Sequence, residues 1–183
     1  MKTAPDRDIA AGVGYRLDVL VFALLLVIAV YLQWGSGAYV NEFGDNADEA
    51  AHYVTGLMVR DFMLSGDWRD PLRFAEQYYV HYPKVAFGHW GPVFYLVQGL
   101  WSLACGVSRT SVLVLMALIT SALALVLYRV VKRSAALPVL GFGLGVALIT
   151  NMAVQRYTSS IMTEQLSALL MFSALKNNDK VGL

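Results

Sequence analysis

The sequence predicts an all-α membrane protein with about four membrane-spanning helices and one large polar loop after the first of them. Hydrophobic residues make up 57% of the 183 residues and charged residues only 15%, with a mean hydropathy of +0.54. A water-soluble domain cannot hide that much apolar surface. The apolar residues are also gathered in runs, and the longest are close to the ~20 residues that cross the hydrocarbon core of a bilayer.

The first spanning helix is predicted at residues 17–34. Three cations precede the run and two aromatic residues close it, namely Lys2, Arg7, Arg16, Tyr31 and Trp34. Cations mark the cytoplasmic side of a span and aromatic rings suit the interface, so the N-terminus is expected in the cytoplasm. A cleaved signal peptide is the alternative, because small residues follow at 36–38, but the later apolar runs favour a retained helix.

Three later runs are apolar enough to be embedded, at residues 111–128, 137–154 and 164–175. A shorter run, 92–105, decides the topology. If it spans, the basic group Arg129, Lys132 and Arg133 falls outside, against the tendency of cations to stay in the cytoplasm. The favoured alternative is an interfacial helix, because about 14 apolar residues make a poor crossing. Loop 35–110 then faces the periplasm, or outer side, of a multi-pass protein of the inner membrane.

A helix is predicted at about residues 47–64 of the polar loop, where apolar residues recur at helical spacing. Asn46 and Glu49 have the spacing of a capping box, and Gly66 is a suitable C-terminal stop. Asp48 and Glu49 then stand in the first helical turn, where carboxylates are stabilising without any catalytic role.

The same acids could also carry chemistry. Adjacent carboxylates just above the membrane could supply a general base. Asp48 and His52 are one turn apart and could contribute to holding a divalent cation, although two ligands do not make a site. Glu164 opens the last apolar run on the same outer face, and an ionisable residue at such a depth is either a site candidate, a bundle-facing partner or a helix-start acid.

The segment before residue 92 offers a candidate phosphate site. His81, Tyr82, Lys84 and His89 stand there among further aromatic residues. A lysine ammonium and imidazoles at headgroup level could hold a lipid-linked phosphate. The alternative is simple anchoring at the interface by the aromatic rings, with Lys84 snorkelling.

Other functional classes are poorly supported. The formal net charge is +1 and no basic tract interleaved with aromatics appears, so nucleic acid is not expected as a partner. The single cysteine, Cys105, excludes an intrachain disulfide and a thiolate metal cluster, and it lies in an apolar stretch as a small hydrophobic residue would.

The order of the motifs carries a family resemblance. After the first span come Asp48-Glu49-Ala50, then MLSGDW at 63–68, then a basic-residue and proline segment leading into an aromatic stretch. This order resembles the membrane-embedded GT-C glycosyltransferases, nearest to the bacterial branch related to protein O-mannosyltransferases and to the aminoarabinose transferase of lipid A. The resemblance covers residues 17–175, which correspond to the N-terminal part of that architecture.

The resemblance implies a polyprenyl-phosphate sugar donor and a set of site residues. Asp48 matches the family's catalytic acid in the first outer loop, and Glu49 looks like its partner. Glu164 occupies the place of the second outer-face acid. Lys84 or His89 is similar in placement to the residue that contacts the donor phosphate, and Trp90-Gly91-Pro92, where relatives commonly show two prolines, leaves the choice open.

Two hypotheses follow for function. The first is an enzyme that transfers a sugar from a polyprenyl-phosphate donor to a lipid, glycan or protein acceptor on the outer face. The sequence identifies no definite cofactor and leaves a divalent cation open. The second is a non-catalytic polytopic membrane protein, such as a transporter part or an assembly partner. In both cases membrane lipid is a partner, and further transmembrane helices or a partner subunit are expected to complete the fold.

Overall fold

The structure, a computed structural model, describes residues 4–43, 46–66, 68–86 and 88–178. Within these ranges every regular element is an α-helix, which confirms the all-α part of the predicted fold class. In chain order the helices are α1 (Ala4–Gly35), α2 (Ala47–Ser65), α3 (Pro71–His81), α4 (Val93–Cys105), α5 (Arg109–Ser134), α6 (Pro138–Thr150), α7 (Met152–Thr158) and α8 (Glu164–Asn178). Lys2, and Asp67 of the MLSGDW motif, lie outside the described residues.

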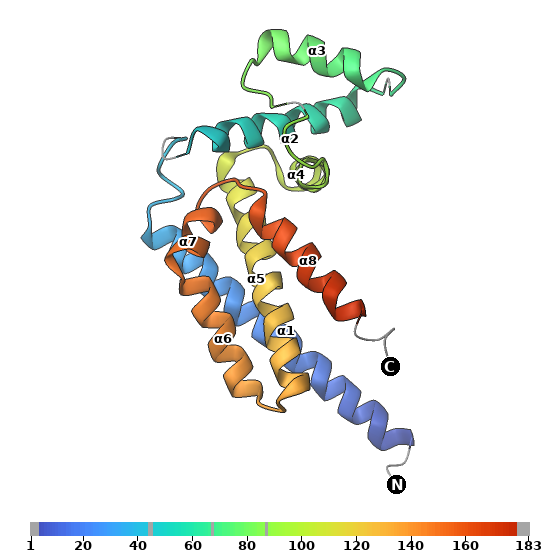
Figure 1. Ribbon diagram of the computed structural model, residues 1–183, viewed down its shortest axis with the longest axis vertical. Coiled ribbons are helices and arrows are strands. Elements are labelled where there is room, and N and C mark those ends of the chain that lie inside the picture. The colour runs from blue at the N-terminus through green and yellow to red at the C-terminus, as the bar shows by residue number, and fades with distance from the viewer. Residues whose placement is uncertain (1–3, 44–45, 67, 87, 179–183) are drawn as a thin grey trace.

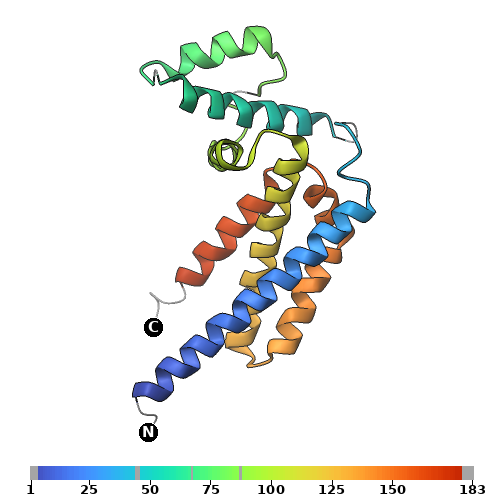
Figure 2. The same cartoon turned by 180° about the vertical axis from the view of Figure 1, so that it is seen from behind.

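Among the described helices, α1, α5, α6 and α8 form a bundle, and three others lie across one of its ends. α4 lies between α2 and the bundle, and α3 packs on α2 farther out (Figure 1). The view from behind shows the same arrangement (Figure 2). We call the end that carries α2, α3 and α4 the covered end. The start of α1 lies at the opposite end.

The short apolar helix α4 lies across the bundle end instead of running along the bundle. Its axis is seen end-on where the bundle is vertical (Figure 1). It is 13 residues long and buries Phe94, Tyr95 and Gln98 against its neighbours. This is the orientation that the interfacial alternative for residues 92–105 requires.

In the part of the chain that the structure describes, two helices are long and apolar enough to cross a membrane. They are α1 from Gly14 to Gly35, with a mean hydropathy of 2.3, and α5, with 2.5. α6 and α7 together make a third candidate, bent by 67°. The predicted count of four therefore becomes two to three by length and composition, because α8 has only 15 residues and a span needs about 20.

The predicted embedded run at 137–154 is not one straight helix. It breaks at Asn151, whose backbone is extended (φ −62°, ψ 131°) and whose side chain accepts a hydrogen bond from the Ala153 amide at 3.0 Å. Asparagine side chains compete in this way with the helix backbone and favour cap positions. The result is that α7 turns away from α6 at the covered end.

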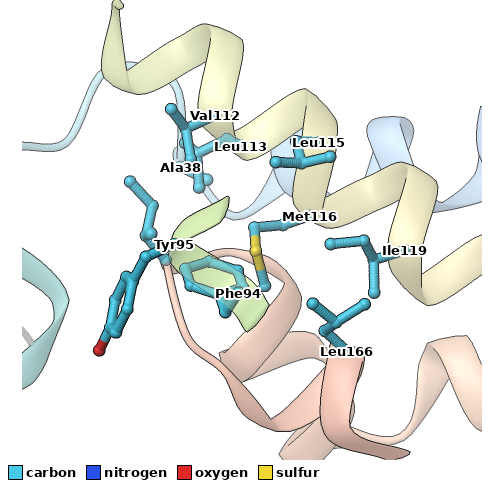
Figure 3. Close-up of a cluster of buried hydrophobic side chains, with 10 residues drawn as sticks. Ala38, Phe94, Tyr95, Val112, Leu113, Leu115, Met116, Ile119 and Leu166 are labelled. Atoms are coloured by element: carbon cyan, nitrogen blue, oxygen red, sulfur yellow. The ribbon is translucent and has the colours of Figure 1, made fainter. Parts of the chain in front are cut away.

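The central helix of the bundle is α5. In its most apolar 18-residue stretch 56% is buried inside the protein, whereas the corresponding stretch of α1 is 22% buried. Near the covered end α5 supplies Val112, Leu113, Leu115, Met116 and Ile119 to a cluster that also takes side chains from α4 and α8 (Figure 3). Farther along, Leu25 and Ala29 of α1 pack on Ala124 of α5. The wide apolar face that α1 leaves exposed is suited to contact with lipid or with further helices.

Polar side chains fix α1 to α5 at two levels. The fully buried Gln33 donates from Nε2 to the carbonyl oxygens of Leu113 (2.8 Å) and Thr158 (2.6 Å). At the opposite end Asp18 of α1 accepts from Arg129 Nε (2.8 Å) and Lys132 Nζ (2.9 Å) of α5. Buried or paired polar groups of this kind set the register of neighbouring helices.

The ends of α2 agree with the local sequence signals in part. Asn46 caps the helix and accepts from the Asp48 amide at 3.1 Å, and Gly66 ends it with a left-handed backbone (φ 70°). The Glu49 carboxylate, the second member of the predicted capping box, binds Arg109 through its Oε1. Sequence analysis also missed α3, although Asp70-Pro71 is a good helix start, with Asp70 accepting from the Arg73 amide at 3.0 Å.

The packing of α6 on α5 depends on Gly141. A Cβ atom there would lie 2.9 Å from the Tyr128 carbonyl oxygen, whereas one at Gly143 would meet nothing within 4 Å. We expect Gly141→Ala to lower the free energy of unfolding by about 1 to 3 kcal/mol, because backbone must move. Gly143→Ala should be neutral or slightly stabilising. Thermal unfolding in detergent measures both, and equal effects would contradict the close contact.

Candidate functional site

The first candidate acid, Glu49, is buried in an ion pair. Its side chain is 3% exposed, and its Oε1 accepts from Arg109 Nη2 at 2.7 Å and from Nε at 3.1 Å. The amide of Ile161, in the loop between α7 and α8, donates to the same oxygen at 3.2 Å. Glu49 therefore joins α2 to the start of α5 and to the loop that leads into α8.

Arg109 completes this connection. Its Nη1 donates to the carbonyl oxygens of Ala38 (2.5 Å) and Asn41 (3.0 Å), and its guanidinium lies 5.3 Å from the centre of the Phe43 ring. The guanidinium is thus saturated by one carboxylate and two carbonyls. The geometry gives Glu49 a positioning role. Sequence analysis missed Arg109, whose one signal was a cation at the outer start of a spanning helix.

The second group gathers around His52, on the neighbouring face of α2. The imidazole is 1% exposed, its Nδ1 is 2.9 Å from the Tyr95 hydroxyl, and its ring centre is 4.3 Å from that of Trp90. Burial lowers the pKa of His52 below its usual value, while the negative charges of Glu164 and Asp48 oppose that shift. His52 is therefore neutral at pH 7 and has two carboxylates near it.

Tyr95 of α4 connects the same group to α8. Burial, and next the charge of Glu164, raises the pKa of the Tyr95 hydroxyl to about 12. The hydroxyl therefore keeps its proton at neutral pH. We call Asp48, His52, Tyr95 and Glu164 the acid–histidine cluster; both of its carboxylates are exposed to solvent, while His52 and Tyr95 are buried.

The predicted phosphate-binding residues divide into two sets. His89 is exposed, and its ring lies 5.5 Å from Trp90, which in turn contacts His52. Lys84 is exposed next to Val85, which packs with Met58 and Ala75, and it joins none of the contacts of the acid–histidine cluster found in the described ranges. Of the two open candidates, His89 is the one that ring contacts connect, through Trp90, to His52.

The other two candidates for phosphate binding, His81 and Tyr82, contact residues of α3. Nδ1 of His81 is 3.0 Å from the Gln77 carbonyl oxygen, at the end of that helix. The Tyr82 ring lies 4.8 Å from the Tyr78 ring. These contacts account for both side chains locally, as helix capping and aromatic packing.

The structure adds no third ligand, among the residues that it describes, to the possible cation ligands Asp48 and His52. Over residues 4–43, 46–66, 68–86 and 88–178 no three His, Cys, Asp or Glu side chains are grouped so that they could hold a metal ion. Nδ1 of His52 is also taken up by Tyr95. What the cluster offers is proton chemistry, since a neutral imidazole and two carboxylates can each accept a proton.

The fold and this cluster define a class: an all-helical, membrane-associated protein with two to three candidate spanning helices and an ionisable group at one end of its bundle. Comparison of the chain with protein-family models, with curated proteins and with solved structures found no match.

Proposed function

We propose that the protein is a membrane glycosyltransferase of GT-C type, which takes a sugar from a polyprenyl-phosphate donor and passes it to a lipid, glycan or protein acceptor. One observation carries the proposal. Asp48 and Glu164 come from distant parts of the chain, yet both act on the buried neutral His52 at the covered end. Convergence of titratable groups on one buried histidine is typical of functional sites.

The chemistry needs these residue types. A hydroxyl or amine of the acceptor bonds to the anomeric carbon of the sugar, while the bond from that carbon to the phosphate oxygen breaks and the phosphate leaves on its lipid. Asp48 is proposed to take the proton of the acceptor, with Glu164 as the second acid. His89, or alternatively Lys84, meets the negative charge of the phosphate at headgroup level. Glu49 holds Asp48 in position through the ion pair with Arg109.

The proposal includes a topology in the inner membrane with the N-terminus in the cytoplasm. α1, α5, and α6 with α7 would make three crossings, with the covered end outside, and α8, with 15 residues, would enter the membrane from the outer face as the fourth embedded helix. Arg129, Lys132 and Arg133 stand near the end of α5 that lies away from the covered end, as a cytoplasmic location demands. Further helices or a partner subunit would cover the exposed apolar face of α1.

Cysteine labelling tests this topology. Cys105 is exposed at the covered end and serves as a natural outside reporter. We expect a membrane-impermeant maleimide, added to intact cells, to label Cys105 in the wild type and to leave a Cys105→Ala/Val130→Cys variant unlabelled until the membrane is opened. Labelling at position 130 from outside would reverse the topology.

The function is tested by release of sugar from a labelled polyprenyl-phosphate donor in membranes that contain the protein. We expect transfer with the wild type and with Glu76→Gln, an exposed acid on α3, and a severe loss with Asp48→Asn and with Glu164→Gln. Transfer that is insensitive to both site variants would refute the catalytic roles. No transfer at all would favour the second candidate, a non-catalytic membrane protein. The ion pair between Glu49 and Arg109 also supports this candidate, because it occupies one of the two adjacent carboxylates.

A further inference from the structure

A second polar feature at the covered end is separate from the acid–histidine cluster. It is a cavity of about 590 Å³ whose walls come from the loop after α1, the start of α2, the start of α5, and α7 with the loop after it. Neither Asp48 nor Glu164 lines it. We call it the α7 cavity. Its size is in the range that holds a small ligand or a lipid headgroup.

The charges in the wall of the α7 cavity are of two kinds. Glu49 and Arg109 line it as a closed pair, so their charges cancel. Glu42 and Arg156 also line it, both are exposed, and neither forms an ion pair with any part of the chain that the structure describes. Among the lining residues that the structure describes, the cavity therefore offers one free carboxylate from the loop after α1 and one free guanidinium from α7.

The neutral part of the wall supplies hydrogen-bonding groups. Asn41, Gln155 and Ser160 line the cavity, as do the hydroxyl groups of Ser36 and Ser159, which lie 3.3 Å apart. A simple anion would meet only one free cation here, together with a repelling carboxylate. A ligand that carries one negative and one positive group satisfies both free charges.

The position of the cavity identifies the source of such a ligand. Ser36 and Ala38 of its wall follow directly on α1, one of the two helices able to span a membrane. Trp34 (70% exposed), near the end of that helix, is a residue type that marks headgroup depth, and Met152 (86% exposed) adds an apolar edge to the cavity. Zwitterionic phospholipid headgroups are the zwitterions available at that depth.

We propose that the α7 cavity binds the headgroup of a zwitterionic phospholipid of the phosphoethanolamine class. The Arg156 guanidinium binds the phosphate, and the Glu42 carboxylate binds the ammonium group. This inference goes beyond the proposed sugar transfer and requires only that the covered end lies at the membrane surface. A failure of the transfer assay leaves it intact.

Lipid binding to the 183-residue chain in detergent micelles tests the proposal, with short-chain phosphatidylethanolamine, short-chain phosphatidylglycerol and free phosphoethanolamine as probes. We expect saturable binding of the ethanolamine lipid, at least about tenfold tighter than the other two, as the loss of one charged hydrogen bond implies. Free phosphoethanolamine that binds as tightly as the lipid would overturn the lipid as the source.

Matched variants assign the two charges. Glu42→Gln should remove the preference for ethanolamine over glycerol, because only the ammonium partner is lost. Arg156→Gln should weaken both lipids. Glu76→Gln on α3 and Arg133→Gln at the far end of α5 are exposed charge removals outside the cavity and should change nothing. Thermal unfolding of each variant checks the fold. Equal binding of both lipids by wild type and by Glu42→Gln, or no saturable binding, would overturn the proposal.

Discussion

Replacing Arg109 with methionine is expected to lower the free energy of unfolding by about 3 to 5 kcal/mol, the cost of breaking one side of a buried ion pair. The Glu49 side chain is 3% exposed, and of the donors that the structure describes at its Oε1, the Ile161 amide alone would remain. The loop carbonyls of Ala38 and Asn41 would also lose their donor. The loop after α1, α2 and the loop before α8 should therefore loosen together.

Thermal unfolding in detergent measures this effect, and roughly 2 to 4 °C per kcal/mol is expected for a chain of this size. Arg133→Met is the matched control, because Arg133 is exposed near the other end of the same helix, and it should change stability by less than about 0.5 kcal/mol. The double variant Glu49→Gln/Arg109→Met should regain part of the loss, because no charge then stays buried alone. A single variant as stable as the control would contradict the structural role of the pair.

Local sequence signals predicted where α2 begins and ends, but they did not predict which side chains its residues contact in the rest of the chain. Asn46 and Gly66 set the ends of α2 because capping depends on residues within one turn. The partner of Glu49 is Arg109, which lies far along the chain, and no short-range pattern distinguishes it from any other acid of a first helical turn. The ion pair of Glu49 therefore follows from tertiary packing and from no signal within the helix that carries it.

The contrast between local signals and tertiary contacts also explains the outcomes for α4, for the break at Asn151 and for His52. The orientation of α4 could be anticipated because the charges near the end of α5 and the length of the run limited it. The break at Asn151 could not, since a single polar residue near the end of an apolar run is tolerated in many spanning helices. The contact of His52 with Tyr95 arises only when α2 packs across α4, so the spacing of His52 and Asp48 within α2 could not reveal it.

Asp48→Asn is expected to reduce sugar transfer by about 100-fold or more, the contribution of a positioned general base. The fold should tolerate the change. The Asp48 side chain is exposed, and the bond that Asn46 accepts comes from the Asp48 backbone amide, which the variant keeps. At most about 1 kcal/mol of favourable interaction with the helix start is lost. A large fall in turnover with an unchanged unfolding temperature is therefore the signature of a chemical role.

His52→Gln distinguishes positioning from chemistry within the cluster. Glutamine removes the imidazole from its site beside Trp90 and the Tyr95 hydroxyl, and the variant should lower turnover less than Asp48→Asn does. It should also flatten the pH profile below about pH 6.5, where a histidine of depressed pKa begins to gain its proton. If His52→Gln abolished transfer and Asp48→Asn left it intact, the imidazole would be the base and Asp48 only a helix-start acid.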